Sequence, residues 1–221
     1  MDRSSKNRLM QRHQSLFQGE TLFEKIARAV CRAEVLPRKE LYESWEVAKR
    51  ARRVFRGGRV VDLACGHGLL AHIMMILDST SPEAISVDMN IPKNAVILSQ
   101  SLMETWPRLK SHVHFLEAPI DDIPVNSQDI ILSIHACGSL TDSVIRKAIS
   151  GNARLAVLPC CHDLSVCDTG GLEGWIDGPF AVDATRAANL SSQGYTVITQ
   201  KIPEDITPKN RLLMGYPNRY D

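Results

Sequence analysis

The chain has 221 residues, of which 44% are hydrophobic and 23% charged, and its formal net charge is +1. This composition excludes an intrinsically disordered chain, and the length suits one α/β domain with a helical extension. No apolar run approaches the roughly 20 residues of a membrane helix, and the polar start from Met1 to Lys6 is not that of a secretory signal, so no membrane partner is expected.

The first part of the chain is polar and basic. Residues 1–18 are expected to be flexible, and helical spacing of apolar residues predicts a helix over 21–34 that Pro37 ends. A second helix is predicted over about 39–56, before Gly57-Gly58. We expect residues 1–58, a polar tail with basic helices, to precede the main domain.

Short apolar strands alternate with helices in the main domain, residues 59–221. Strands are predicted at 60–64, 84–88, 113–116, 129–134, 155–158, 195–199 and 211–216. Helices are predicted at 69–77, after Pro92, at 139–149 with Ser139 as N-cap, and at 180–192. Such alternation predicts an α/β fold: a doubly wound, Rossmann-like, seven-stranded and mostly parallel sheet. No helix separates the last two strands, so they should close the sheet as an antiparallel hairpin.

A glycine turn follows the first strand. Gly66 and Gly68 let the backbone approach a ligand, and the next helix begins there. Asp88 ends the second strand about 20 residues later, where a carboxylate binds both hydroxyls of a ribose. The pattern indicates a ligand that contains adenosine.

Two classes of enzyme use such a turn. Gly66-x-Gly68-x-x-Ala71 also fits the loose dinucleotide pattern, so an NAD(P)-dependent oxidoreductase is an alternative. Asp62, inside the first strand, has no obvious use in a dinucleotide site but suits a ligand with a free α-amino group. The terminal hairpin is also unusual for a dinucleotide domain.

These features together resemble the class I methyltransferase superfamily, over residues 59–216. The resemblance implies S-adenosylmethionine as cofactor, with Gly66 and Gly68 at its methionine part, Asp62 near its amino group and Asp88 on its ribose. His67 should face the ligand or the mouth of the site, and Ala64 and Met89 flank the turn and the acid as further cofactor contacts. Pro119 stands where the family often has an acid for the adenine, so Ile120 or Asp121 is the expected contact there.

The fourth and fifth strands end in His135-Ala136-Cys137-Gly138 and Pro159-Cys160-Cys161-His162. This pairing resembles a methyltransferase subgroup that includes a tRNA acceptor-stem 2′-O-methyltransferase domain and a glutathione-transferase-like fusion protein. Thr207-Pro208-Lys209-Asn210-Arg211 looks like another feature of that subgroup. The Asn/Asp-Pro-Pro-aromatic motif of amino-directed nucleic-acid enzymes is lacking at the fourth strand.

Methyl transfer needs an oriented acceptor, and a base if the acceptor is a hydroxyl or thiol. His135, which should also lie against the cofactor, is the first candidate base, and His162 is the second. Both are alternatively structural histidines. Cys137 and Asp142 complete the catalytic candidates, although Asp142 also suits a helix cap.

The six cysteines show no disulfide spacing, which indicates reduced thiols in a cytoplasmic protein. Cys137, Cys160 and Cys161 are nucleophiles, metal ligands or small buried side chains. We predict no metal site, because adjacent cysteines lack zinc-finger spacing and there is no second Cys-x-x-Cys.

Charge is unevenly distributed and bears on the acceptor. Residues 1–59 carry 15 Lys and Arg against 7 acidic residues, while residues 60–221 carry 11 against 18. A basic helical segment over 49–59 slightly favours RNA as methyl acceptor, whereas the acidic main domain favours a small molecule. A non-catalytic, donor-binding module is a further alternative, and the sequence leaves the oligomeric state open.

Overall fold

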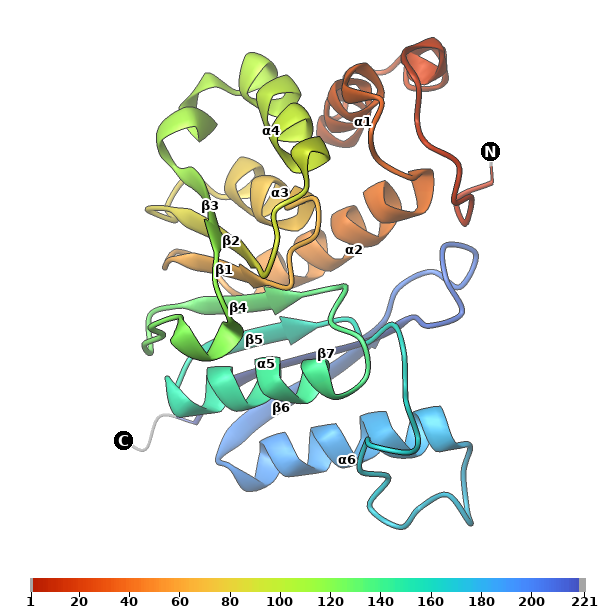
Figure 1. The fold of residues 1–221 in the computed structure, drawn as a ribbon, viewed down its shortest axis with the longest axis vertical. Helices are drawn as coiled ribbons and strands as arrows, with labels where there is room; N and C mark the ends of the chain where they lie inside the picture. The colour runs from red at the N-terminus through yellow and green to blue at the C-terminus, as the bar shows by residue number, and fades with distance from the viewer. Residues whose placement is uncertain (1, 219–221) are drawn as a thin grey trace.

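The predicted strands form one central sheet in a computed structural model that describes residues 2–218 (Figure 1). They are β1 (Val60–Leu63), β2 (Ala84–Asp88), β3 (Val113–Glu117), β4 (Ile130–Ser133), β5 (Arg154–Val157), β6 (Tyr195–Lys201) and β7 (Arg211–Pro217). Their order is β3-β2-β1-β4-β5-β7-β6. The first five strands pair in parallel, and β7 lies antiparallel between β5 and β6. The predicted doubly wound sheet with a terminal hairpin is confirmed.

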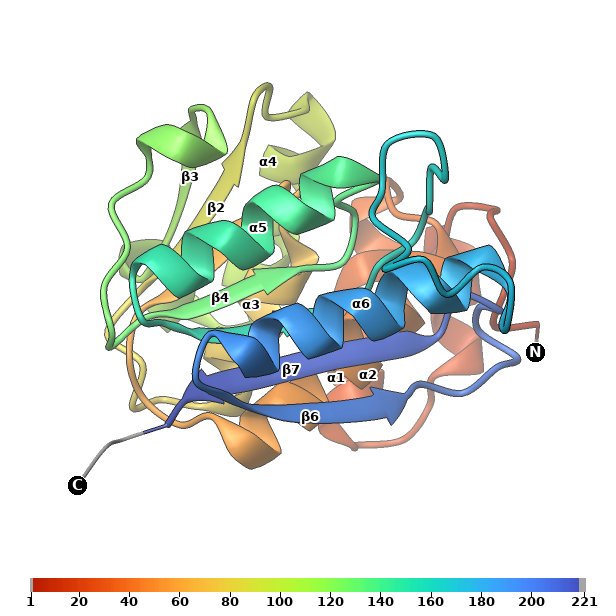
Figure 2. The ribbon, with the colours of Figure 1, turned by 90° about the horizontal axis from the view of Figure 1, so that it is seen from below.

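Helices cover both faces of the sheet (Figures 1 and 2). They are α1 (Leu22–Ala33), α2 (Arg38–Val54), α3 (Leu69–Leu77), α4 (Lys93–Thr105), α5 (Ser139–Ser150) and α6 (Gly178–Ser192), with short 3-10 helices at Gln11–Leu16, Pro107–Ser111 and Ile120–Asp122. One core lies between the sheet and α1 to α4, and a second lies beneath α5 and α6. Among the described helices, none combines the length and the apolar character that crossing a membrane requires.

The strand order reverses beside β1. This strand pairs with β2 on one side and with β4 on the other, and all four of its residues are buried. In open parallel sheets, ligands bind outside the carboxyl ends of the strands at such a reversal. The topology therefore brings the ends of β1, β2, β4 and β5 to one edge.

The first residues are packed rather than flexible. The backbone N–H of Leu9 donates to the Leu36 carbonyl at 2.9 Å, and the side chains of Leu9 and Phe17 are buried in the core under α1. The expectation of a flexible tail is wrong over the described residues 2–18, because these two apolar side chains anchor an otherwise polar segment.

The basic segment also differs from its prediction. The helix α2 ends at Val54 rather than continuing to 59. Arg52 is only 2% exposed: its Nη1 lies 3.2 Å from Asp78 Oδ2, and its Nε donates to the Met74 carbonyl at 3.0 Å. Lys49 and Arg50 both pair with Glu46. A uniformly exposed basic face is therefore absent from this helix, since burial and ion pairing use several of its cations.

Candidate active site

The turn after β1 is fastened to the end of β2. The backbone N–H of Gly66 donates to Asp88 Oδ2 at 2.9 Å, and the N–H of Met89 donates to Asp88 Oδ1 at 2.8 Å. Gly66 has φ +54° and Gly68 has φ +70°, and a Cβ on Gly68 would lie 2.7 Å from the Phe115 ring. Only glycine satisfies both the left-handed backbone and the close approach at Gly68.

A cavity of about 230 Å³ opens beside this turn. Five residues predicted to contact the cofactor line it: Ala64, Asp88, Met89, Ile120 and Asp121. Ala118, Pro119, Leu140 and Ser143 complete the lining and were not proposed from the sequence. Leu140 and Ser143 belong to α5, and only the pairing of β4 beside β1 could have placed that helix there.

Asp62 lies beneath the turn and is 1% exposed. Its Oδ2 accepts the backbone N–H of Ala71 at 3.3 Å, while its Oδ1 has no donor within the described residues. Burial raises the pKa of the Asp62 carboxyl well above its usual range, and the nearby Asp88 charge adds to the effect. A buried acceptor without a donor is costly, so a ligand bringing an ammonium group fits this position.

His67 connects the glycine turn to α2. Its Nδ1 lies 3.0 Å from Glu40 Oε2, in the first turn of that helix. The ring is therefore held by a carboxylate from outside the turn. No sequence pattern pairs these two residues, which are 27 positions apart.

His135 follows β4 and packs over the turn. Its ring Cδ2 lies 3.8 Å from where a Cβ on Gly66 would stand. Burial lowers the pKa of the His135 imidazole, and the attraction of the Glu40 charge only partly offsets this. Neither ring nitrogen has a hydrogen-bond partner among the described residues. A neutral imidazole with free nitrogens is suited to accept a proton.

The other two polar candidates join an ion network on α6. Arg186 donates to both carboxylate oxygens of Asp142, at 2.7 and 2.9 Å. His162 Nε2 lies 2.7 Å from Asp183 Oδ1, and Arg211 Nε donates to Asp183 Oδ2 at 2.7 Å. The predicted capping by Ser139 is wrong, because Gly138 is the N-cap and no side chain caps the helix. Both Asp142 and His162 are therefore held by charged partners on α6.

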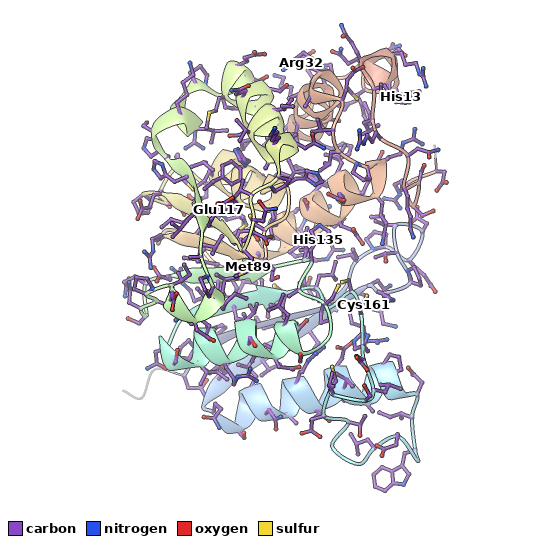
Figure 3. The ribbon with its side chains drawn as sticks, in the orientation of Figure 1. His13, Arg32, Met89, Glu117, His135 and Cys161 are labelled. Atoms are coloured by element: carbon purple, nitrogen blue, oxygen red, sulfur yellow. The ribbon has the colours of Figure 1, made fainter. Side chains whose placement is uncertain are left out.

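The cysteines after β4 and β5 face outward. Cys137 and Cys161 are exposed and Cys160 is half-buried, so the alternative of small buried side chains is wrong for Cys137 and Cys161. A cavity of about 380 Å³ is lined by Cys137, Cys161 and His162, among others. In the view of Figure 3, His135 is labelled between Met89 and Cys161, near the middle of the molecule.

The sheet order, the glycine turn and the acid at the end of β2 together define the Rossmann-like fold of S-adenosylmethionine-dependent methyltransferases. A family model described as a methyltransferase domain matches residues 39–166, which is more than half of the chain. The chain belongs to this methyltransferase family.

Two solved structures share the fold. An O-methyltransferase family protein from Burkholderia thailandensis has a TM-score of 0.55 and 16% identity, over 95% of this chain and 64% of that one. A magnesium protoporphyrin IX methyltransferase from Synechocystis PCC 6803, solved with bound SAH, has a TM-score of 0.53 and 14% identity, over 94% and 93%. At this identity the likeness shows the fold alone.

A curated protein is also similar in sequence. It is a glutathione S-transferase C-terminal domain-containing protein homolog from Drosophila pseudoobscura pseudoobscura, 26% identical over 200 residues. The match covers 72% of this chain and 33% of the relative. The chain thus spans about a third of the length of the curated relatives it matches.

Proposed function

We propose that this chain methylates an oxygen or sulfur nucleophile on a small molecule. The observation that carries the proposal is the position of His135, an imidazole with free nitrogens, packed over the glycine turn beside the cavity of Asp88. This arrangement puts a proton acceptor next to the predicted cofactor site.

The turn and the cavity account for cofactor binding. In the proposal, Asp88 accepts hydrogen bonds from the ribose hydroxyls, and Ile120 and Asp121 lie at the adenine. The unpaired Oδ1 of Asp62 attracts the ammonium group from below the turn. S-adenosylmethionine supplies a methyl group on a sulfonium that is already activated for in-line displacement.

His135 supplies the acid–base chemistry. A hydroxyl or thiol must lose its proton as it attacks, and His135 accepts that proton on a ring nitrogen. Its lowered pKa keeps the ring neutral near pH 7, so a ring nitrogen is able to accept a proton at that pH. An amine acceptor would need less help, and the lack of an Asn/Asp-Pro-Pro-aromatic motif agrees with oxygen or sulfur.

The shape of the site favours a small acceptor. The 380 Å³ cavity at Cys137 and Cys161 is within the range of small-molecule pockets. Arg53 and Arg56, the exposed cations near the end of α2, lie at the opposite end of this 17-residue helix from Glu40. At 1.5 Å per residue that separation is about 20 Å, so these two cations do not line the turn at which Glu40 holds His67.

Labelled methyl donor tests the acceptor. The chain is incubated with fractions of cell extract and radiolabelled S-adenosylmethionine, and the label is followed into RNA, protein and small molecules. We expect label in the small-molecule fraction, and much less of it when Asp88→Ala replaces the wild type at a donor concentration below saturation. Label in RNA, with binding that weakens steeply as salt rises, would replace the small-molecule proposal by an RNA one. The comparisons give no support to the oxidoreductase alternative.

A further inference from the structure

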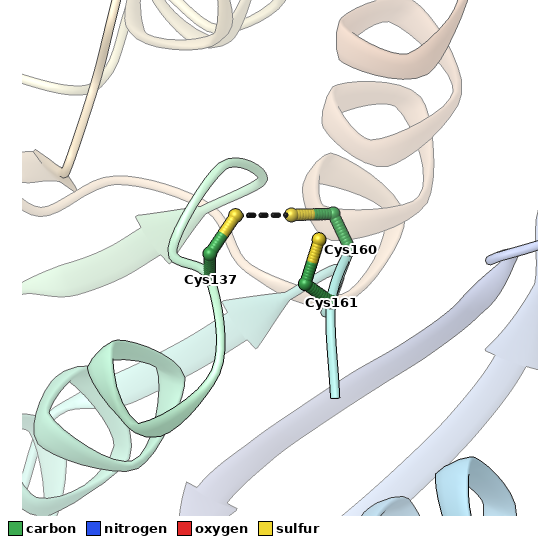
Figure 4. Close-up of side chains that lie close together, drawn as sticks. All are labelled: Cys137, Cys160 and Cys161. Atoms are coloured by element: carbon green, nitrogen blue, oxygen red, sulfur yellow. Dashed lines mark hydrogen bonds between the residues drawn. The ribbon is translucent and has the colours of Figure 1, made fainter. Parts of the chain in front are cut away.

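Three thiols from two loops converge beside the cavity at the ends of β4 and β5 (Figure 4). Cys137 comes from the loop after β4, and Cys160 and Cys161 come from the loop after β5. The Sγ atoms of Cys137 and Cys160 are 3.0 Å apart, and all three Sγ atoms lie within 4.8 Å of one another. No other group of three metal-ligating side chains this close occurs in residues 2–218.

The backbone explains why adjacent cysteines point the same way. In a strand, successive side chains point to opposite faces, but β5 ends at Val157, before the cysteines. The N–H of Gly138 donates to the Cys161 carbonyl at 3.1 Å and joins the two loops. Arg186 Nη2 in turn donates to the Gly138 carbonyl at 2.9 Å. The convergence of the thiols is therefore built into the fold.

We infer that Cys137, Cys160 and Cys161 bind one Zn²⁺ ion as thiolates. A Zn–S bond of about 2.3 Å in tetrahedral geometry separates two sulfurs by roughly 3.8 Å. This spacing lies between the 3.0 Å of the Cys137–Cys160 pair and the 4.8 Å within which all three sulfurs lie. Small rotations of the side chains would bring the three sulfurs to that spacing. The sequence does not predict this site, because the spacing of Cys137, Cys160 and Cys161 along the chain is not that of a zinc finger.

Charge and access agree with this site. Three thiolates around Zn²⁺ carry a net charge of −1, and Lys209 Nζ lies 3.5 Å from Cys161 Sγ. The ammonium group offsets the charge of such a complex. Cys137 and Cys161 also line the 380 Å³ cavity, so an ion can enter and its fourth position is free for water or a ligand.

The inference is independent of the methyl acceptor and is tested without activity. The full chain is reduced, stripped of metal with a chelator and titrated with Co²⁺, which reports thiolate ligands and tetrahedral geometry through its absorption. We expect one Co²⁺ per chain with thiolate charge-transfer bands, displaced by one equivalent of Zn²⁺. Cys137→Ala, Cys160→Ala and Cys161→Ala should each weaken Zn²⁺ binding about 100-fold or more.

Cys31→Ala is the matched control, because Cys31 is buried in α1 and outside the cluster. It should leave Zn²⁺ affinity unchanged, and circular dichroism checks that each variant is folded. Absence of the charge-transfer bands in the reduced wild type would overturn the inference. So would equal Zn²⁺ affinity in the wild type and the three cluster variants. Calorimetry with S-adenosylmethionine on the same samples shows separately whether the cofactor site stands.

Discussion

The Asp88 carboxylate accepts the backbone N–H of Gly66 at 2.9 Å, across 22 positions of sequence. The acid expected to hold the ribose therefore also holds the turn expected to hold the methionine part. Because the same carboxylate fixes both, the cofactor site is shaped before any ligand arrives. This double role makes Asp88 the residue on which the site depends most.

Replacing Asp88 should weaken cofactor binding without unfolding the chain. In Asp88→Ala, the loss of charged hydrogen bonds to the ribose, at about 1.5–3 kcal/mol, predicts S-adenosylmethionine affinity about 10- to 100-fold lower by calorimetry. Glu83→Ala, before the first residue of the same strand, is the control and should bind as the wild type does. Unchanged affinity in Asp88→Ala would contradict the assignment.

A methyl group on Gly66 should cost stability as well as affinity. Alanine at φ +54° is strained by about 1–2 kcal/mol, so thermal unfolding of Gly66→Ala should shift down by roughly 2–8 °C. The new Cβ would also stand at the turn, 3.8 Å from His135. Gly174→Ala, whose Cβ would meet nothing within 4 Å, should change neither property. Equal melting temperatures for Gly66→Ala and Gly174→Ala would show that alanine at position 66 is not strained.

His135→Gln separates chemistry from cofactor binding. Without a base, methyl transfer to a hydroxyl or thiol should slow about 100- to 10,000-fold, while S-adenosylmethionine affinity changes by less than about threefold. The measurement is single-turnover transfer to the labelled acceptor beside calorimetry. His114→Gln, on the exposed β3 edge, is the control. A normal transfer rate in His135→Gln would favour an acceptor that needs no base, or a binding module whose biological role is not methylation.

Acid should remove a defined part of the stability. Burial of Asp78 works against its ionisation, but hydrogen bonds from Thr80 and Gly57 and the charge of Arg52 hold the pKa of its carboxyl at about 2. Because the pKa of Asp78 falls from 3.8 to about 2 on folding, its ionised carboxylate stabilises the fold by about 2 kcal/mol above pH 3.8. This stabilisation is lost as the pH falls through a value of about 2. Asp78→Asn should therefore be less stable than the wild type at pH 6, with the gap closing near pH 2.

Denaturant unfolding at several pH values measures that gap. The exposed Asp122→Asn is the control, and its difference from the wild type should stay small throughout. A gap between wild type and Asp78→Asn that stayed constant from pH 6 to pH 2 would mean that the Asp78 ion pair contributes nothing.

Substitution of two neighbouring arginines should change the free energy of unfolding by very different amounts. Arg52→Ala leaves the buried Asp78 without its cation and should lower the free energy of unfolding by about 3 kcal/mol. Arg53→Ala removes an exposed side chain and should stay within about 0.5 kcal/mol of the wild type. Urea unfolding of the two variants compares them directly, and a similar loss in both would contradict the burial of Arg52.

The sequence predicted the sheet because each strand is a short apolar run bounded by turn residues, and β1 at Val60–Leu63 and β2 at Ala84–Asp88 lie almost as expected. The cavity could be predicted for a related reason: residues at the ends of adjacent parallel strands meet at one edge. Ala64, Asp88 and Ile120 are brought together in this way.

The features that could not be predicted from the sequence depend on residues that lie far apart along the chain. A run of arginines in α2 looks exposed until Asp78, 26 residues after Arg52, is brought beside it by the packing of α2 on α3. The pairing of His67 with Glu40 likewise needs the start of α2 to lie at the turn. Adjacent cysteines look divergent until the loop after β5 is seen to leave the extended conformation.

Calorimetric titration of the wild-type chain with S-adenosylmethionine and, separately, with NADH tests the account most directly. We predict saturable binding of one S-adenosylmethionine per chain and no heat of binding with NADH. Binding of NADH without binding of S-adenosylmethionine would contradict the assignment of the glycine turn, and with it the roles of Asp62 and Asp88.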